Sequence, residues 1–310
     1  MIHRFARAAG ASLALMFMLP LAAPAASLPT LPVADAQFDA DSLHVARFGH
    51  GDPVVLLPGL TTGPWEFADL IRRLAPRYTV YAVSLPGFDG RPAAAPPLFD
   101  RVTRDFWAMV AAQTMARPVL IGHSIGGTLA ILLGEQHPER LRGIVAIDGL
   151  PIFPGLERIT PEQRAGAAQQ GSAAIATLTR QQLLDYEKSY MNSSGGVLDA
   201  GEAAAAAELE ANGDTPTIAQ WLREDLLADL RPDLPKITVP LLEIVPFNAP
   251  DLAGQPLSYT EAQKVAYYRT LLTGAPKLNV VSVSPARHFA MLDQPDNVFA
   301  LVSAFLTEAR

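Results

Sequence analysis

Short apolar runs alternate with segments of helical periodicity along most of the chain. The apolar runs are rich in Val, Leu and Ile and show little polar alternation, which is typical of strands buried on both faces. They predict strands at 42–49, 53–59, 78–87, 118–124, 141–148, 239–246 and 277–284. Apolar residues at helical spacing predict helices at 64–75, 98–114, 125–137, 258–272 and 296–309. This alternation predicts an α/β fold, with a mostly parallel central sheet and helices on both faces.

The alternation stops between residues 149 and 235, where helices and loops follow one another without a strand. This stretch includes the Ala-rich segment "GEAAAAAELEANGD", a predicted helix closed by Asn212-Gly213. We therefore predict a core made of residues 26–148 and 236–310. We predict that the insert at 149–235 forms a helical cap over the candidate nucleophile described below.

The first 25 residues have the features of a secretory signal peptide. Arg4 and Arg7 precede an apolar run, and Ala23 and Ala25 form an A-x-A site. The alternative is a retained membrane anchor, but the run is short for a spanning helix, which needs about 20 residues. We expect cleavage after Ala25, export to the periplasm or beyond, and a mature chain with no stable membrane anchor.

Composition excludes several classes of function. The net charge of -7 and the absence of a dense block of Lys and Arg argue against a nucleic-acid-binding surface. The chain has no cysteine, so it has no disulfide, thiol nucleophile or zinc–thiolate site. No cluster of histidines has metal-ligand spacing, and we expect neither a metal nor another cofactor.

The segment "PVLIGHSIGGTLA", residues 118–130, carries the strongest chemical signal. Its G-x-S-x-G pattern at Gly122–Gly126 follows a predicted buried strand and opens a predicted helix, the setting in which a serine becomes an exposed nucleophile. Ser124 is the candidate nucleophile. The backbone N–H of Ile125, at the helix N-terminus, is a candidate donor to a developing oxyanion.

With this motif the chain resembles the α/β-hydrolase family, of the esterase and lipase type with a helical cap. The resemblance covers residues 42–310 apart from the insert. It implies that the loop "LLPGLTTGPW" carries the second oxyanion donor, the N–H of Leu60. The family often has His-Gly in this loop, whereas this chain has Pro58-Gly59. The segment "SLPGFDGRP" at 84–92 is loosely similar to another turn of the family.

The resemblance also implies the general base. The segment "SPARHFAMLDQP" at 284–295 follows the last predicted strand, and His288 is similar to the family's G-H-F-x-x-x-E-x-P histidine. Arg287 stands in place of the glycine and Asp293 in place of the glutamate. His123 is next to Ser124 in the sequence, but at a sharp turn we expect its side chain to point elsewhere.

Two acids compete for the role of orienting His288. Most family members place this acid after the strand that follows the insert, where Asp251 is the first acid in the loop. Pancreatic-type lipases and some haloalkane-dehalogenase-like members place it at the end of the strand before the insert, where this chain has Asp148. We favour Asp148 because it lies directly at a strand end, and we keep Asp251 as the alternative.

The expected reaction is ester hydrolysis of a small acyl substrate by a Ser-His-Asp triad through an acyl-enzyme. The same triad supports amide hydrolysis, C–C bond hydrolysis or perhydrolysis, and the fold also supports a non-catalytic binding protein. In the predicted cap, Tyr186, Tyr190, Met191 and Trp221 either line a substrate pocket or pack the cap onto the core. The sequence identifies neither substrate-binding residues nor an oligomeric state.

Overall fold

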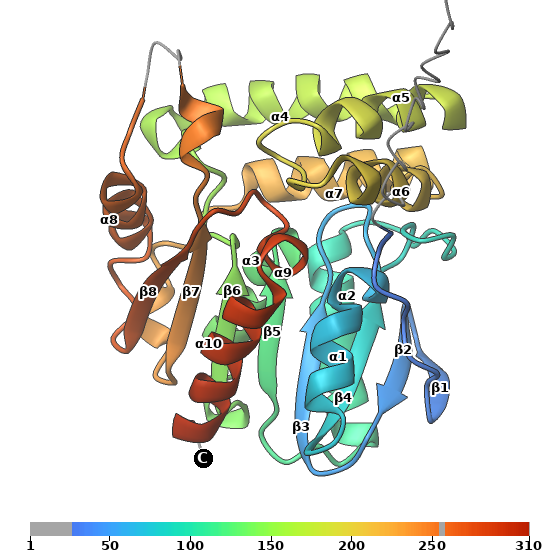
Figure 1. The fold of residues 1–310 in the computed structure, drawn as a ribbon, viewed down its shortest axis with the longest axis vertical. Coiled ribbons are helices and arrows are strands. Elements are labelled where there is room, and N and C mark those ends of the chain that lie inside the picture. The colour runs from blue at the N-terminus through green and yellow to red at the C-terminus, as the bar shows by residue number, and fades with distance from the viewer. Residues whose placement is uncertain (1–26, 254–257, 310) are drawn as a thin grey trace, which may run out of the picture.

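The computed structural model describes residues 27–253 and 258–309, so the predicted signal segment at 1–25 lies outside the described residues. The described chain forms an eight-stranded sheet with the strand order β1-β2-β4-β3-β5-β6-β7-β8 (Figure 1). The strands are β1 Ala36–Ala40, β2 Leu43–Phe48, β3 Asp52–Leu57, β4 Tyr78–Ser84, β5 Val119–His123, β6 Gly143–Ile147, β7 Leu241–Pro246 and β8 Leu278–Val283. All neighbouring strands from β4 to β8 pair parallel, whereas β1 pairs antiparallel with β2 and β2 pairs antiparallel with β4. The predicted α/β fold is confirmed.

Helices cover both faces of this sheet (Figure 1). They are α1 Ala68–Leu74, α2 Leu98–Ala112, α3 Ile125–Gln136, α8 Glu261–Leu271, α9 Ala290–Asp293 and α10 Pro295–Glu308. Because side chains alternate along a strand, each strand contributes to two cores. In β3, Val55 and Leu57 pack in the core that contains α2, α3 and α8, while Val54 and Leu56 pack in the core of α1 and α10.

Four further helices lie between β6 and β7 in the chain, above the carboxyl ends of the parallel strands (Figure 1). They are α4 Pro161–Ala176, α5 Arg180–Met191, α6 Ala200–Glu210 and α7 Thr215–Leu227, which we call the cap helices. Side chains at their N-caps, such as Thr160 and Asp199, accept hydrogen bonds from the first turn. Trp221 of α7 is fully buried, and its indole N–H donates to the Pro86 carbonyl at 3.0 Å, which holds the cap helices on the core.

Strand β1 is an element that the sequence pattern did not predict, since it falls in the Pro- and Ala-rich stretch before residue 42. It forms an edge that pairs antiparallel with β2, with Phe38 opposite Val45. Its residues alternate between partly buried and exposed, so the segment lacks the apolar run that marks the inner strands.

None of the helices in the described part of the chain has the length and hydropathy needed to cross a membrane.

Candidate active site

Ser124 lies at a sharp turn between β5 and α3. Its φ of +52° is in the left-handed region, which non-glycine residues seldom adopt. The turn needs glycine on both sides: a Cβ at Gly122 would lie 2.1 Å from the Gly126 carbonyl oxygen, and a Cβ at Gly126 would lie 2.1 Å from the Leu57 carbonyl oxygen. This close packing of backbone on backbone forces Ser124 into the strained conformation, with its side chain lining a pocket.

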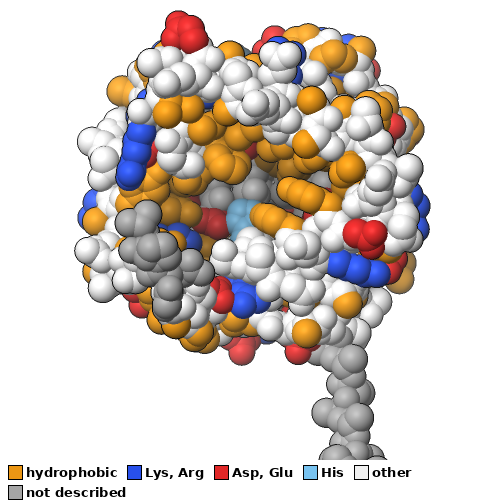
Figure 2. All heavy atoms as spheres, turned by 90° about the horizontal axis from the view of Figure 1, so that it is seen from above, with side chains coloured by type: hydrophobic (Ala, Val, Ile, Leu, Met, Phe, Trp, Pro, Cys, Tyr) orange, Lys and Arg blue, Asp and Glu red, His pale blue; other side chains and the backbone are white. Residues whose placement is uncertain are grey.

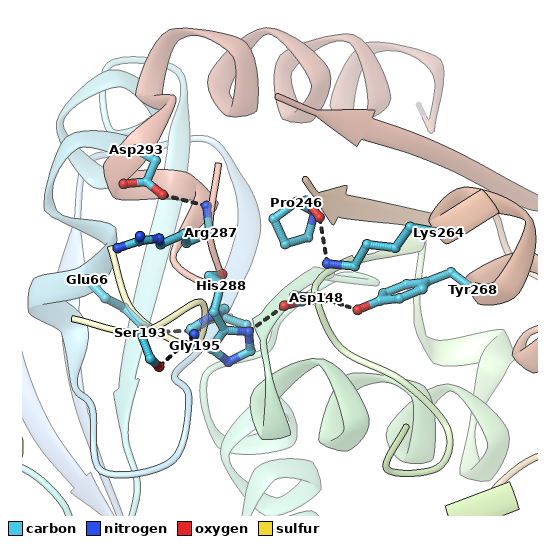
Figure 3. Close-up of polar contacts among 11 residues, drawn as sticks. Glu66, Asp148, Ser193, Gly195, Pro246, Lys264, Tyr268, Arg287, His288 and Asp293 are labelled. Carbon is cyan, nitrogen blue, oxygen red and sulfur yellow. Dashed lines mark hydrogen bonds and ion pairs between the residues drawn. The ribbon is translucent and has the colours of Figure 1, made fainter. Parts of the chain in front are cut away.

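Asp148 and His288 meet at the same edge of the sheet. Asp148 directly follows β6, and its Oδ2 lies 2.5 Å from Nδ1 of His288. Its other oxygen accepts a hydrogen bond from the Tyr268 hydroxyl of α8, so the carboxylate is held from two sides (Figure 3). Ser124, Asp148 and His288 line one pocket. The structure thus brings together the three residues that the sequence singled out as nucleophile, acid and base.

Opposing effects set the charge states of this pair. Burial alone would raise the pKa of Asp148, but the charges of His288 and Lys264 and the hydrogen bonds from His288 and Tyr268 outweigh it and hold the pKa far below its usual range. Burial lowers the pKa of His288, and the Asp148 charge only partly opposes this effect. At neutral pH the site therefore holds an ionised carboxylate and a neutral imidazole.

Asp251, the alternative acid, is engaged elsewhere. The Arg287 guanidinium donates to both of its carboxylate oxygens, from Nε at 2.9 Å and from Nη2 at 2.7 Å. Asp293 accepts a hydrogen bond from the Arg287 backbone N–H at 2.7 Å (Figure 3). The two departures from the family pattern, Arg287 and Asp293, therefore hold the loop that carries His288. The geometry puts Asp148, and not Asp251, against the imidazole.

Glu66 and His123 form a buried pair that the sequence reasoning missed. Nδ1 of His123 lies 2.9 Å from Oε2 of Glu66, and both side chains are almost fully buried. The opposite ring nitrogen, Nε2, lies 3.2 Å from the His288 carbonyl oxygen. Oε1 of Glu66 accepts a hydrogen bond from the Gly59 N–H at 3.0 Å. The Glu66 carboxylate therefore holds the Gly59 N–H directly and, through His123, is linked to the backbone of His288.

The two candidate oxyanion donors lie beside Ser124. Leu60 and Ile125 line a cavity together with Ser124 and His288. Ile125 is the first residue of α3, where backbone N–H groups have no partner within the helix and the helix dipole favours negative charge. Thr61, next to Leu60, has a φ of +66°, so this loop is also bent into the left-handed region.

Two adjoining cavities, of about 410 and 150 Å³, meet at Ser124 and His288. Figure 2 looks into this part of the molecule and shows a hollow with mostly hydrophobic walls and a histidine side chain at its bottom. Of the four cap residues considered from the sequence, Tyr186 and Tyr190 line the smaller cavity. Met191 and Trp221 are fully buried and pack in the core.

In the described part of the chain, no group of three or more His, Asp or Glu side chains is arranged to hold a metal ion. The geometry has the parts of nucleophilic catalysis, namely a strained serine, a neutral imidazole and an ionised acid on the far side of that imidazole.

Comparison with known proteins identifies the family. The model of the alpha/beta hydrolase family matches residues 54–301. The chain belongs to this family. Among curated proteins, it is similar to the pimeloyl-[acyl-carrier protein] methyl ester esterase of Aeromonas hydrophila, at 34% identity over 133 residues. The same enzyme of Yersinia enterocolitica matches at 34% identity over 129 residues.

These curated matches are partial. The Aeromonas match covers 41% of this chain and 51% of its relative, and the Yersinia match covers 39% and 47%. The chain thus spans about half the length of the curated relatives it matches.

Solved structures match over most of the chain. The enol-lactonase from Burkholderia xenovorans LB400 has a TM-score of 0.62 at 21% identity, covering 86% of this chain and 96% of its own. MenH from S. aureus has a TM-score of 0.68 at 17% identity, covering 86% and 98%. A membrane phospholipase A, described as a bacterial virulence factor, has a TM-score of 0.64 at 20% identity, covering 89% and 86%. At these identities the likeness concerns the fold.

Proposed function

We propose that this protein is an exported serine hydrolase that cleaves carboxylic esters through an acyl-enzyme. The observation that carries the proposal is the contact of 2.5 Å between Asp148 Oδ2 and His288 Nδ1, in a pocket that Ser124 also lines. Because Nδ1 faces the carboxylate, Nε2 is the nitrogen of His288 that takes the proton of the serine. Family membership and the partial similarity to methyl ester esterases support ester hydrolysis.

The reaction follows from these positions. Ser124 Oγ attacks the ester carbonyl while His288 removes its proton, and Asp148 stabilises the imidazolium that forms. The N–H groups of Leu60 and Ile125 hold the negative oxygen of the tetrahedral intermediate. His288 then gives its proton to the leaving alcohol. In the second half, His288 deprotonates a water molecule that releases the acid from Ser124.

Labelling with a fluorophosphonate, together with hydrolysis of p-nitrophenyl butyrate, tests this proposal. We expect the wild type to be labelled once, on Ser124, and to hydrolyse the ester. Ser124→Ala should lose labelling and about four or more powers of ten in kcat. Ser303→Ala, on the outer helix α10, serves as the matched serine control and should retain both. Labelling on another residue, or wild-type turnover by Ser124→Ala, would refute the proposal.

Export is the second part of the proposal, and it rests on the charged start, the apolar run and the A-x-A site of residues 1–25. The test is the intact mass of protein recovered from the periplasm of an expressing Gram-negative host. A mature chain that begins at Ala26 is expected. Protein that stays in the membrane fraction with residues 1–25 attached would contradict cleavage and favour the anchor.

A further inference from the structure

The backbone at Asp148 is fixed independently of its side chain. Asp148 has a φ of +51°, in the left-handed region that non-glycine residues seldom adopt. Its N–H donates to the Ile244 carbonyl at 3.0 Å, which extends the ladder between β6 and β7 by one bond. A strained residue persists only where its surroundings hold it. The end of β6 therefore determines where the carboxylate lies, but not which way its two oxygens face.

The carboxylate of Asp148 borders two cavities. It shares the cavity of about 410 Å³ with Ser124, and it shares a further cavity of about 450 Å³ with Lys264 and Arg287. Both cavities are wide enough to admit water, which would compete with His288 for the carboxylate oxygens. A carboxylate in this place needs a second donor to keep one of its oxygens on the imidazole.

Tyr268 of α8 supplies that donor. Its hydroxyl donates to Asp148 Oδ1, which leaves Oδ2 for Nδ1 of His288 (Figure 3). Tyr268 is 5% exposed, so the packing around its ring fixes the direction from which the hydroxyl reaches the carboxylate. Burial and the charge of Asp148 raise the pKa of Tyr268 well above its usual range. The hydroxyl therefore keeps its proton and remains a donor while the charges of the triad change.

Lys264 lies one helical turn before Tyr268, on the same face of α8. Its Nζ donates to the Pro246 carbonyl at the end of β7, at 2.7 Å, and lies 5.4 Å from the centre of the Tyr268 ring. The first contact joins α8 to the sheet, and the second places an ammonium group beside the ring that carries the donor. Lys264 also lines a cavity with Asp148 and His288, and its charge acts on both of them.

We propose that Tyr268 and Lys264 are positioning residues, through which α8 directs the acid that follows β6 toward the base. The inference rests on the proposed ester hydrolysis. Tyr268 sets the orientation of the Asp148 carboxylate, and Lys264 sets the charge around it. The positive charge of Lys264 disfavours a second positive charge on the imidazole, so His288 stays neutral to lower pH. Both residues act through Asp148 and His288, without touching the substrate.

Other titratable side chains surround the same pair. In the described chain they are His123 of β5, Tyr190 of α5, Glu243 of β7, Tyr259 before α8, and Arg287. His123 is paired with Glu66, and Arg287 donates to both oxygens of Asp251. Burial raises the pKa of Glu243 well above its usual range, which favours its protonated form. Lys264 is therefore the residue whose replacement changes the charge beside the pair.

Tyr268→Phe tests the orienting role, because it removes the hydroxyl and keeps the ring. With p-nitrophenyl butyrate we expect kcat to fall about tenfold or more while KM changes little, since the substrate site is intact but the base is poorly aligned. Tyr267→Phe is the matched control, because Tyr267 donates to Glu157 and does not contact Asp148. It should keep the wild-type kcat. A folded Tyr268→Phe variant with the wild-type kcat, or with a change in KM alone, would overturn the orienting role.

Lys264→Met tests the role of the charge, and Lys264→Gln repeats the test with a polar side chain. We expect the acid limb of kcat/KM to move to higher pH, because the imidazolium of His288 gains stability when the cation is removed. Lys264→Arg keeps the charge and should keep the wild-type midpoint. Lys277→Met, at an exposed position, is the matched control. A midpoint that is unchanged or lower in the folded Met and Gln variants would overturn the role of the charge.

A measurement without turnover separates this inference from the proposed function. In Ser124→Ala protein with isotope-labelled histidine, NMR titration reports the pKa of His288, whose signal is assigned by its absence from His288→Asn. Adding Lys264→Met should raise this pKa, and adding Tyr268→Phe should speed exchange of the Nδ1 proton with water. A protein that shows both changes but hydrolyses no ester keeps the positioning residues and loses the hydrolase. A protein that hydrolyses esters and shows neither change keeps the hydrolase and loses the positioning residues.

Discussion

Buried carboxyl groups occur in two neighbouring regions of this molecule, and their surroundings differ. At the edge of the sheet, Asp148 faces His288, Lys264 and Tyr268, and its pKa is held far below the usual range. Beneath the cap helices, Glu187 and Glu210 face each other without a cation, and burial raises both pKa values. The first region is arranged to keep a charge throughout a reaction. In the second, no lysine or arginine among the described residues lines the smaller cavity, and burial favours the protonated forms of the two acids.

Exchanging Asp148 for asparagine should give the largest effect in this comparison. Asparagine keeps the shape of the side chain but favours the wrong imidazole tautomer of His288, so kcat should fall by about four powers of ten. Asp251→Asn, in the connection that follows β7, is the control. It removes the charge of a carboxylate that pairs with Arg287, and it should lower kcat only a few-fold. Steady-state hydrolysis of p-nitrophenyl butyrate separates the two, and the reverse order would assign the role to Asp251.

A smaller loss of kcat should follow when the buried pair of Glu66 and His123 is disrupted. Glu66→Ala removes the group that holds the Gly59 N–H and His123, and so releases both the oxyanion loop and the backbone of His288. Misplacement of about an ångström costs up to about a hundredfold in rate, so we expect kcat to fall by about 10- to 100-fold while KM changes less. Glu139→Ala, at an exposed position, should leave kcat unchanged. A change in KM alone would show that Glu66 acts in binding only.

The pH dependence of kcat/KM should reveal the environment of His288. The base must be neutral, so activity is present above the pKa of His288 and is lost as the pH falls through it. Because burial lowers this pKa, the midpoint of the acid limb should lie below the usual value of about 6.5. Glu210→Gln should leave this midpoint in place. A midpoint above 6.5 would mean that the charge of Asp148 outweighs burial.

Replacing a carboxyl group of the cap helices should produce the smallest effect, which is a change in Tm that depends on pH. A group whose pKa is raised on folding contributes stability at low pH that is lost as the pH rises from its ordinary value, about 4.5, through its folded-state pKa, which burial and the neighbouring Glu187 place well above that value for Glu210. Glu210→Gln relieves this loss. Its Tm relative to the wild type should therefore increase by on the order of 2 °C between pH 5 and pH 8. A difference in Tm that is constant over this range would show that the pair is not strained by ionisation.

Local signals in the sequence were sufficient for the architecture and for the serine turn. Continuous Val and Leu runs predict inner strands, and Gly122 and Gly126 are required by contacts within the turn and with Leu57 next to it. Edge strand β1 lacks such a run and was missed. The sequence left both Asp148 and Asp251 open as the acid. The structure engages Asp251 with Arg287, and this contact cannot be deduced from spacing along the chain.

The contacts that were missed join residues far apart in the sequence. Glu66 and His123 are separated by 57 positions. The Glu187–Glu210 pair depends on how α5 lies against α6. One signal was available: Glu187 is four positions after Leu183 and four before Met191, so it lies on the buried face of its helix. An acid at such a position is worth examining in any helical insert.

The loop that carries His288 also has a consequence for building chimeras of this protein. Arg287 donates from Nη1 to the Val197 carbonyl at 2.9 Å, and the Leu198 N–H donates to Asp293 at 2.7 Å. These two bonds join the connection between α5 and α6 to the strand edge. A transplanted insert should therefore keep residues 197–198 with their native backbone path. A graft that exchanges this connection as well would loosen the imidazole, even with every catalytic side chain retained.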